Sequence, residues 1–259
     1  MKAIFILFII ALLSNSPALS ATLKLPECLL EQSLETEVHF YISEDVLNEY
    51  SPEFVKAKID SWIAYANTTL KNSCIPTRRS ATHIEYVSEL DSSWFQDVDV
   101  AERLLKNELG RQVPETNANG HPIFNAIVFS NWLNSYKSQY CGYASSSTFF
   151  FTIALNCPDS VLEHEIGHLS GASHDIKTLK EGVEAFDLEE YWMSSYPPGK
   201  PYSLGYVCAG RGTIMSYEDD RMPVYSNPNI YWDSKICGDA VTADNSRVLT
   251  EFAKQYLVR

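Results

Sequence analysis

Basic side chains are scarce in this chain of 259 residues. It contains 20 lysines and arginines against 33 aspartates and glutamates, which gives a formal net charge of −13 at pH 7. Such an acidic chain is a poor candidate for binding nucleic acids or anionic membrane surfaces, because both repel negative charge. The charge is better explained as a means of keeping the protein soluble. We therefore expect no nucleic-acid partner.

Long apolar runs are also lacking, and the one run near the start is short. Ala3–Leu13 follows Lys2 and precedes the small residues Ala18–Ser20. A run of eleven residues is too short to cross a bilayer, which takes about 20. The arrangement is typical of a secretory signal peptide with its cleavage site. We expect residues 1–20 to be a signal peptide and residues 21–259 to be secreted, extracellular or periplasmic, with no membrane attachment after cleavage.

Internal repeats, low-complexity tracts and linkers rich in glycine or serine are lacking too, so residues 21–259 fit a single domain. Apolar periodicity predicts alternating strands and helices in the first part of this domain. The expected strands are 37–42, 82–87, 123–130, 142–146 and 149–155, and the expected helices are 52–70, 98–109 and 243–256. Alternation of strands and helices implies parallel strands, with an antiparallel one possible among the last three.

Histidine is scarce as well, but three of the six histidines fall within residues 164–174, which read HEIGHLSGASH. Residues four apart lie on one face of a helix, so His164 and His168 can bind the same ion. We expect Asp159 or Ser160 to cap this helix. Glu165 lies about 100° around the axis from His164, beside the ion rather than bound to it. A general base that takes a proton from a metal-bound water is needed at that place.

His174 can reach the same ion only if the helix ends before it. On a continued helix it would lie about 9 Å beyond His168, whereas zinc–nitrogen bonds are about 2.0–2.1 Å long. Gly171 supplies the break, because glycine enters left-handed conformations without a steric penalty. Three protein ligands leave one tetrahedral position open, which is typical of a catalytic zinc. The sequence thus predicts one catalytic zinc ion bound by His164, His168 and His174.

The pattern HExxHxxGxxH, together with a methionine in Thr213–Tyr217, resembles the zinc signature and methionine turn of the metzincin metallopeptidases. The resemblance implies that Met215 lies under the zinc as a hydrophobic floor; an ordinary core methionine is the alternative. It also implies an α+β fold with a twisted, mostly parallel five-stranded sheet, helices, an active-site helix and an irregular C-terminal subdomain. The upper subdomain would span about 21–171 and the lower about 172–259.

Two residues next to the motif resemble different branches of that family. Asp175 directly follows the third histidine, as in the adamalysin or reprolysin branch, where the acid supports the site structurally; an exposed turn aspartate is the alternative. Tyr217 follows Met215 by two residues, as in astacins, serralysins and pappalysins. There the tyrosine can bind zinc or swing away and stabilise the oxyanion; here a packing role is the alternative. Tyr225–Pro228 resembles a segment of bacterial secreted metzincins near the reprolysin-like branch.

The resemblance also suggests where a substrate would lie. Gly142–Ala144 is the candidate for an edge strand that binds the substrate backbone by β-augmentation, with a plain hairpin strand as the alternative. The loop from Lys177 to Cys208 would form the wall of the pocket for the residue after the scissile bond. A solvated loop with aromatic anchors is the simpler account of that loop.

An even number of cysteines in an exported chain indicates disulfides. The chain has six cysteines, which allow fifteen pairings, and we predict the sequential one. The predicted pairs are Cys28–Cys74, Cys141–Cys157 and Cys208–Cys237. An alternative role for Cys28 is that of an inhibitory thiolate ligand held over the zinc.

The sequence therefore predicts a secreted zinc-dependent endopeptidase whose partner is a protein or peptide substrate. Glu165 takes a proton from the zinc-bound water and passes it to the leaving amine, and Tyr217 is a candidate assistant. The alternative is a secreted zinc-containing effector that binds a host protein with little or no turnover, which the intact Glu165 disfavours. A purely structural zinc is disfavoured by the open fourth position.

Overall fold

The computed structural model describes residues 22–29, 32–90, 92–130, 141–181, 186–194 and 199–257. The signal peptide predicted over residues 1–20 lies outside this part. Within the described residues, none of the helices is both long enough and apolar enough to cross a membrane.

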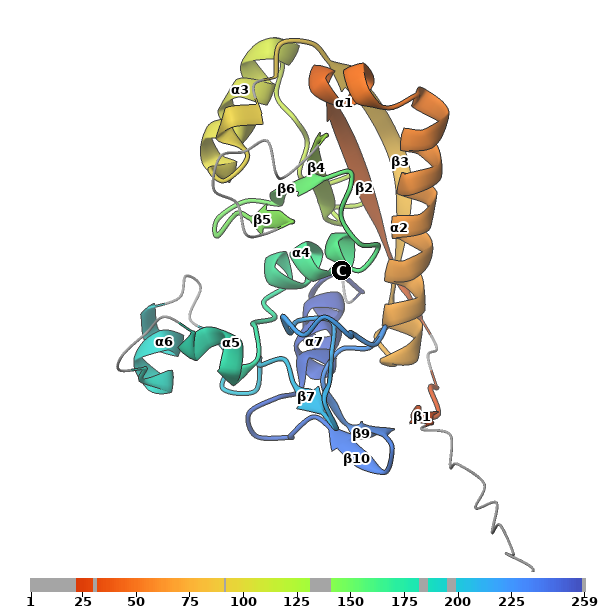
Figure 1. Cartoon of the computed structure of the whole chain (residues 1–259), viewed down its shortest axis with the longest axis vertical. Coiled ribbons are helices and arrows are strands. Elements are labelled where there is room, and N and C mark those ends of the chain that lie inside the picture. Colours follow the sequence, from red (N-terminus) through yellow and green to blue (C-terminus); the bar gives the residue numbers. More distant parts are fainter. Residues whose placement is uncertain are drawn as a thin grey trace, which may run out of the picture.

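The main sheet has five strands, in the spatial order β3-β2-β4-β6-β5 (Figure 1). The strands are β2 (Leu34–Ser43), β3 (Thr77–Val87), β4 (Ile123–Phe129), β5 (Gly142–Ala144) and β6 (Phe150–Ala154). Neighbouring strands are parallel except for β5, which pairs antiparallel with β6 at the edge of the sheet. The predicted five-stranded, mostly parallel sheet is confirmed, and the antiparallel strand is one of the three consecutive ones.

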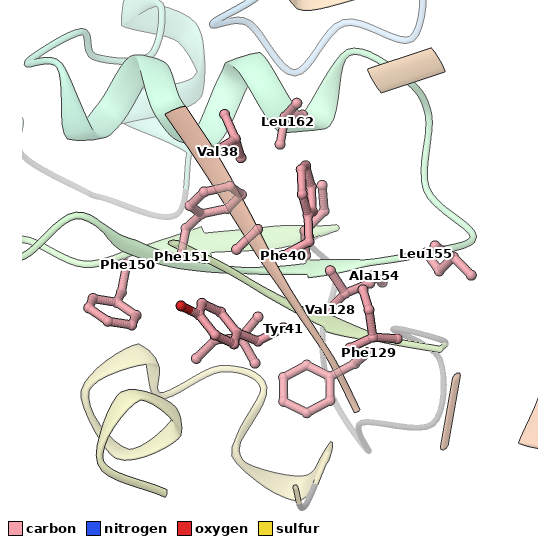
Figure 2. Close-up of a cluster of buried hydrophobic side chains, with 14 of the residues drawn as sticks. Val38, Phe40, Tyr41, Val128, Phe129, Phe150, Phe151, Ala154, Leu155 and Leu162 are labelled. Atoms are coloured by element: carbon pink, nitrogen blue, oxygen red, sulfur yellow. The ribbon is translucent and has the colours of Figure 1, made fainter. Parts of the chain in front are cut away.

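Helices cover both faces of this sheet, which explains why every residue of β4 and β6 is buried. In the core shown in Figure 2, Val38 and Phe151 point toward the helix that carries Leu162. Tyr41 and Phe150 point to the opposite face, where α3 (Val98–Leu109) lies. Both faces of the sheet are therefore held by apolar packing, and the zinc-motif helix is part of that packing.

The predicted helices 52–70 and 98–109 are confirmed as α2 (Pro52–Asn72) and α3. Ser51 caps α2, since its side chain accepts from the amide of Phe54, and Pro52 occupies the first turn. Gly110 ends α3 with a φ of 59°, a left-handed conformation that glycine adopts without strain. A short helix before α2, α1 (Glu44–Glu49), was not predicted.

The motif helix is α4 (Val161–Leu169). It begins after Ser160 as expected, but the Ser160 side chain makes no capping bond. Asp159 does not cap it either: its carboxylate accepts from Lys58 Nζ at 2.6 Å and from Ser61 Oγ, both on α2. The prediction of a side-chain cap was wrong, because Asp159 joins the start of α4 to a helix about a hundred residues earlier in the chain.

The chain after Gly171 contains more regular structure than predicted. The expected last helix is confirmed as α7 (Asn245–Leu257). The other elements are α5 (Ile176–Lys180), α6 (Leu188–Ser194), β7 (Val207–Cys208), β8 (Arg211–Gly212), β9 (Asn227–Trp232) and β10 (Lys235–Cys237). A three-stranded sheet joins β9 and β10 to β1 (Leu23–Lys24) from the start of the described chain. Figure 1 shows α5, α6, α7, β7, β9 and β10 below α4, with the main sheet above it.

All three predicted disulfides are present, and the described residues contain no free cysteine. Cys28–Cys74 ties the first segment to the end of α2, and Cys141–Cys157 links the residues that flank β5 and β6. Cys208–Cys237 joins β7 to β10. Because Cys28 is bonded to Cys74, the alternative in which its thiolate binds the zinc is wrong.

Candidate metal centre

The three motif histidines come together as predicted. Their Nε2 atoms form a small triangle with edges of 3.2 Å from His164 to His168, 3.2 Å from His164 to His174 and 2.9 Å from His168 to His174. Tetrahedral zinc with bonds of 2.0–2.1 Å would set its nitrogen ligands about 3.3 Å apart. The triangle is therefore close to the size that a zinc ion requires.

The outer ring nitrogens show which tautomer is present. His164 Nδ1 lies 2.8 Å from the carbonyl oxygen of Ile214, and His168 Nδ1 lies 3.1 Å from that of Ala172. A carbonyl oxygen can only accept, so both Nδ1 atoms donate and both Nε2 atoms carry lone pairs. Lone pairs facing one another at such distances repel unless a cation lies between them. The donor set thus fits a metal ion.

Burial keeps these imidazoles neutral, as metal ligands must be. Burial lowers the pKa of His168 to about 4. Burial, followed by the neighbouring imidazoles, lowers the pKa of His164 and of His174 well below the ordinary value. The site is therefore ready to bind a cation at neutral pH without first losing protons.

The turn that brings His174 back is the one expected at Gly171. Gly171 has a φ of 92°, and the amide of Ala172 donates to the carbonyl of Gly167 at 2.9 Å. The chain then pairs with a later segment, since Ser173 N donates to Ser203 O at 2.7 Å. The prediction that Gly171 ends the helix and redirects the chain is confirmed.

Glu165 lies against the edge strand and outside the histidine triangle. A Cβ added at Gly142 of β5 would come within 2.7 Å of Glu165 Oε1, so only glycine leaves room for the carboxylate there. Burial raises the pKa of Glu165 to about 8, against the opposing charge of Arg221. The carboxyl is thus a desolvated base at the side of the cleft where β5 ends the sheet.

Met215 is fully buried beneath α4. A Cβ added at Gly167 would lie 2.7 Å from Met215 Sδ, which places the sulfur against the helix turn between two of the histidines. The preceding residue, Ile214, supplies the carbonyl that accepts from His164. The ring of Tyr217 lies 4.5 Å from that of His174, centroid to centroid, and is 40% exposed. The Thr213–Tyr217 segment therefore supports the centre from below and from the side.

Asp175 is buried and is the cap of α5. Its carboxylate accepts from the amides of Lys177 and Thr178 at 2.9 and 3.1 Å, and from Thr178 Oγ1 at 2.6 Å. The alternative of an exposed turn aspartate is wrong. The acid orders the chain directly after the third histidine by starting a helix there.

A buried ion pair behind α4 was missed in the sequence. Glu163, one residue before His164, binds Arg79 of β3 through two hydrogen bonds of 3.1 Å, and both side chains are at most 1% exposed. Arg79 also donates to Thr36 at 3.0 Å, and Tyr225 donates to Glu163 at 2.9 Å. The sequence shows an acid on the buried face of a helix and an arginine at an inward position of a strand. No local pattern indicates that these two residues pair with each other.

The centre opens into a cleft of about 1080 Å³. Gly142–Ala144 of β5 lines it, as do Tyr217 and the aromatic residues Tyr191 and Trp192 of α6. β5 is thus an edge strand that lines the cleft, and α6 forms part of its wall; substrate binding by either one stays a prediction. Residues of α7 also line the cleft, among them Val248 and Phe252.

The chain is similar to bacterial metalloendopeptidases. It is 34% identical over 198 residues to a peptidyl-Asp metalloendopeptidase of Xanthomonas campestris pv. campestris, a match that covers 72% of this chain and 43% of that protein. It is 36% identical over 125 residues to a peptidyl-Asp metalloendopeptidase of Stenotrophomonas maltophilia, covering 44% of this chain and 27% of the relative. The chain thus spans less than half the length of these curated relatives. Both relatives are named as metalloendopeptidases.

No protein-family model matches the chain. Among solved structures, a chain in the structure of a chaperone-substrate complex superimposes with a TM-score of 0.59 at 14% identity. The match covers 88% of this chain and 36% of the other. At this identity the match shows a shared fold and nothing about activity.

Proposed function

We propose that the protein is a secreted zinc-dependent endopeptidase of the metzincin type. The observation that carries the proposal is the triangle of three histidine Nε2 atoms beside a buried glutamate, in a cleft next to a sheet edge. The similarity to metalloendopeptidases supports it, and the three disulfides are consistent with an extracellular or periplasmic location.

His164, His168 and His174 would hold one zinc ion. When bound, such an ion polarises the peptide carbonyl and increases the acidity of water. Glu165 accepts the proton of the attacking water and then donates it to the leaving amine. Its desolvated position beside Gly142 suits this role, because burial strengthens the carboxylate as a base.

Tyr217 and β5 would orient the substrate. The phenol of Tyr217 lies beside His174 and lines the cleft, where it would donate a hydrogen bond to the developing oxyanion. The outer edge of Gly142–Ala144 would pair with an extended peptide backbone. Since the relatives are named peptidyl-Asp metalloendopeptidases, we propose protein or peptide substrates with an aspartate next to the scissile bond.

The test compares the zinc-loaded protein with Glu165→Ala. We expect the variant to retain one equivalent of zinc and to lose at least 1000-fold in hydrolysis of a casein-type substrate, roughly the scale of a lost general base with its electrostatics. Glu108→Ala, at an exposed carboxylate on α3, is the matched control and should keep full activity. Chelation should abolish activity and zinc return should restore it. Undiminished proteolysis by Glu165→Ala would contradict the mechanism.

A further inference from the structure

One side chain gives the cleft a local positive charge. Among the described residues that line it, Lys200 is the only lysine or arginine. The carboxylates that line it are those of Glu115, Glu165 and Glu181. Glu115 is committed to the backbone, since it accepts from the amide of Phe149 at 2.9 Å. A lysine in the cleft of so acidic a chain is unusual, and its contacts indicate what it could bind.

Backbone hydrogen bonds connect the turn that carries Lys200 to the segment that carries His174. The amide of Ser203 donates to the carbonyl of Lys200 at 3.0 Å, which closes a tight turn. Ser203 in turn accepts from Ser173, the residue before His174. The turn from Lys200 to Ser203 is thus hydrogen-bonded to Ser173, which directly precedes the proposed metal ligand His174.

The preceding residue holds this turn against α6. Gly199 donates its amide to the carbonyl of Trp192 at 3.0 Å, and a Cβ at Gly199 would lie 2.5 Å from the indole ring. Any residue with a Cβ would clash with the Trp192 ring, so only glycine fits at position 199. The turn that carries Lys200 is therefore attached to the cleft wall on both sides.

The ammonium is oriented by Glu251 of α7, which lies outside the residues that line the cleft. Glu251 Oε2 accepts from Lys200 Nζ and, at 2.7 Å, from the hydroxyl of Tyr202. Its other oxygen accepts from Arg247 Nε at 3.0 Å. Two cations thus share one carboxylate, and an ammonium has three N–H bonds to give. The Lys200 side chain is 36% exposed.

We propose that Lys200 is the specificity residue of the cleft and pairs with the carboxylate of an acidic substrate side chain, with Glu251 as its positioning partner. The inference rests on the proposed peptidase function and adds the residue that recognises the acid. Glu251 keeps Tyr202 and Arg247 as donors when Lys200 turns toward a substrate, so the second ion pair forms without leaving a carboxylate unpaired. The directional ammonium–carboxylate contact distinguishes aspartate from the isosteric asparagine.

The experiment measures kcat/KM for two fluorogenic peptides that differ only by aspartate or asparagine at the cleavage site. We expect the zinc-loaded wild type to prefer the aspartyl peptide, and Lys200→Met to lower the Asp/Asn ratio by about 10- to 100-fold, the worth of one charge-assisted hydrogen bond. Lys200→Arg should restore part of the ratio. Lys56→Met, which removes an exposed lysine of α2 paired with Asp60 outside the cleft, should leave the ratio unchanged.

Zinc content and the melting temperature of each variant show that it is folded and loaded. A wild type that cleaves neither peptide would overturn the proposed function itself. A wild type that cleaves both peptides equally, or a folded Lys200→Met that keeps the wild-type ratio, would overturn the role of Lys200 and leave the peptidase function standing.

Discussion

Replacing Arg79 with methionine should destabilise the protein by about 3–5 kcal/mol, because it leaves Glu163 as a buried charge without its cation. The two side chains are 1% and 0% exposed, so water cannot compensate the loss. The hydrogen bond from Tyr225 to Glu163 remains and relieves part of the cost. For a domain of this size, each kcal/mol lowers the melting temperature by about 2–4 °C, so the expected shift is about 10 °C.

A double variant, in which Glu163 is also replaced by methionine, separates the effect of losing the ion pair from the effect of changed packing. In Arg79→Met with Glu163→Met, both buried charges are gone, and we expect most of the stability to return. The remaining partners keep hydrogen bonds: Tyr225 also reaches the Glu163 carbonyl at 2.9 Å, and Thr36 donates to the Arg78 carbonyl at 3.1 Å. The double variant should thus be more stable than either single one.

The assay is urea unfolding followed by circular dichroism, with the disulfides intact. Arg78→Met is the matched control on the same strand: Arg78 is 66% exposed and lies 3.7 Å from Glu35, so its loss should cost less than about 0.5 kcal/mol. The reasoning would be refuted by an Arg79→Met protein within 1 kcal/mol of wild type, or by a double variant less stable than both single ones.

Two further predictions concern the cleft. Gly142→Ala should lower kcat/KM by about 10-fold or more with zinc content unchanged, because the new methyl would lie 2.7 Å from Glu165 Oε1 and 2.8 Å from the Thr152 carbonyl; an alanine variant with wild-type kinetics would contradict this. The pKa of Glu251 is lowered to about 2, since hydrogen bonds from Lys200, Tyr202 and Arg247 outweigh the opposing effect of burial. The folding stability that the Glu251 carboxylate contributes is therefore fully present above its unfolded-state pKa and is lost as the pH falls toward 2. The unfolding free energies of wild type and Glu251→Gln should differ by a constant amount above about pH 4.5 and converge as the pH falls toward 2, and a difference that stays unchanged down to that pH would count against the prediction.

The parts of the molecule that the sequence predicts are those encoded over short distances. Helical spacing brings His164 to His168, and the break at Gly171 needs only the backbone freedom of one residue. The same locality explains why the sheet strands and the disulfides could be predicted, each pair being formed by consecutive cysteines. The histidine triangle was thus predictable because all its members lie within eleven residues.

What the sequence did not predict depends on partners far apart in the chain. Asp159 stands at a plausible cap position in the sequence, but in the structure its carboxylate accepts from Lys58 of α2. The strand β9 pairs with β1 near the start of the described chain, so no local pattern of apolar residues reveals it. Glu163 and Arg79 are separated by 84 residues, and only the packing of α4 against β3 and the sheet brings them together.

The histidine triangle also limits which ions the centre can hold. Calcium prefers six to eight oxygen ligands at 2.3–2.6 Å, which would need wider spacing than the 2.9–3.2 Å edges and harder donors than imidazole. Small divalent ions that accept tetrahedral nitrogen ligands, such as cobalt, would suit the same three atoms. Cobalt exchanged into the centre would therefore give a coloured protein. Its visible absorption would change when a substrate or inhibitor enters the cleft, whereas d¹⁰ zinc gives no such signal.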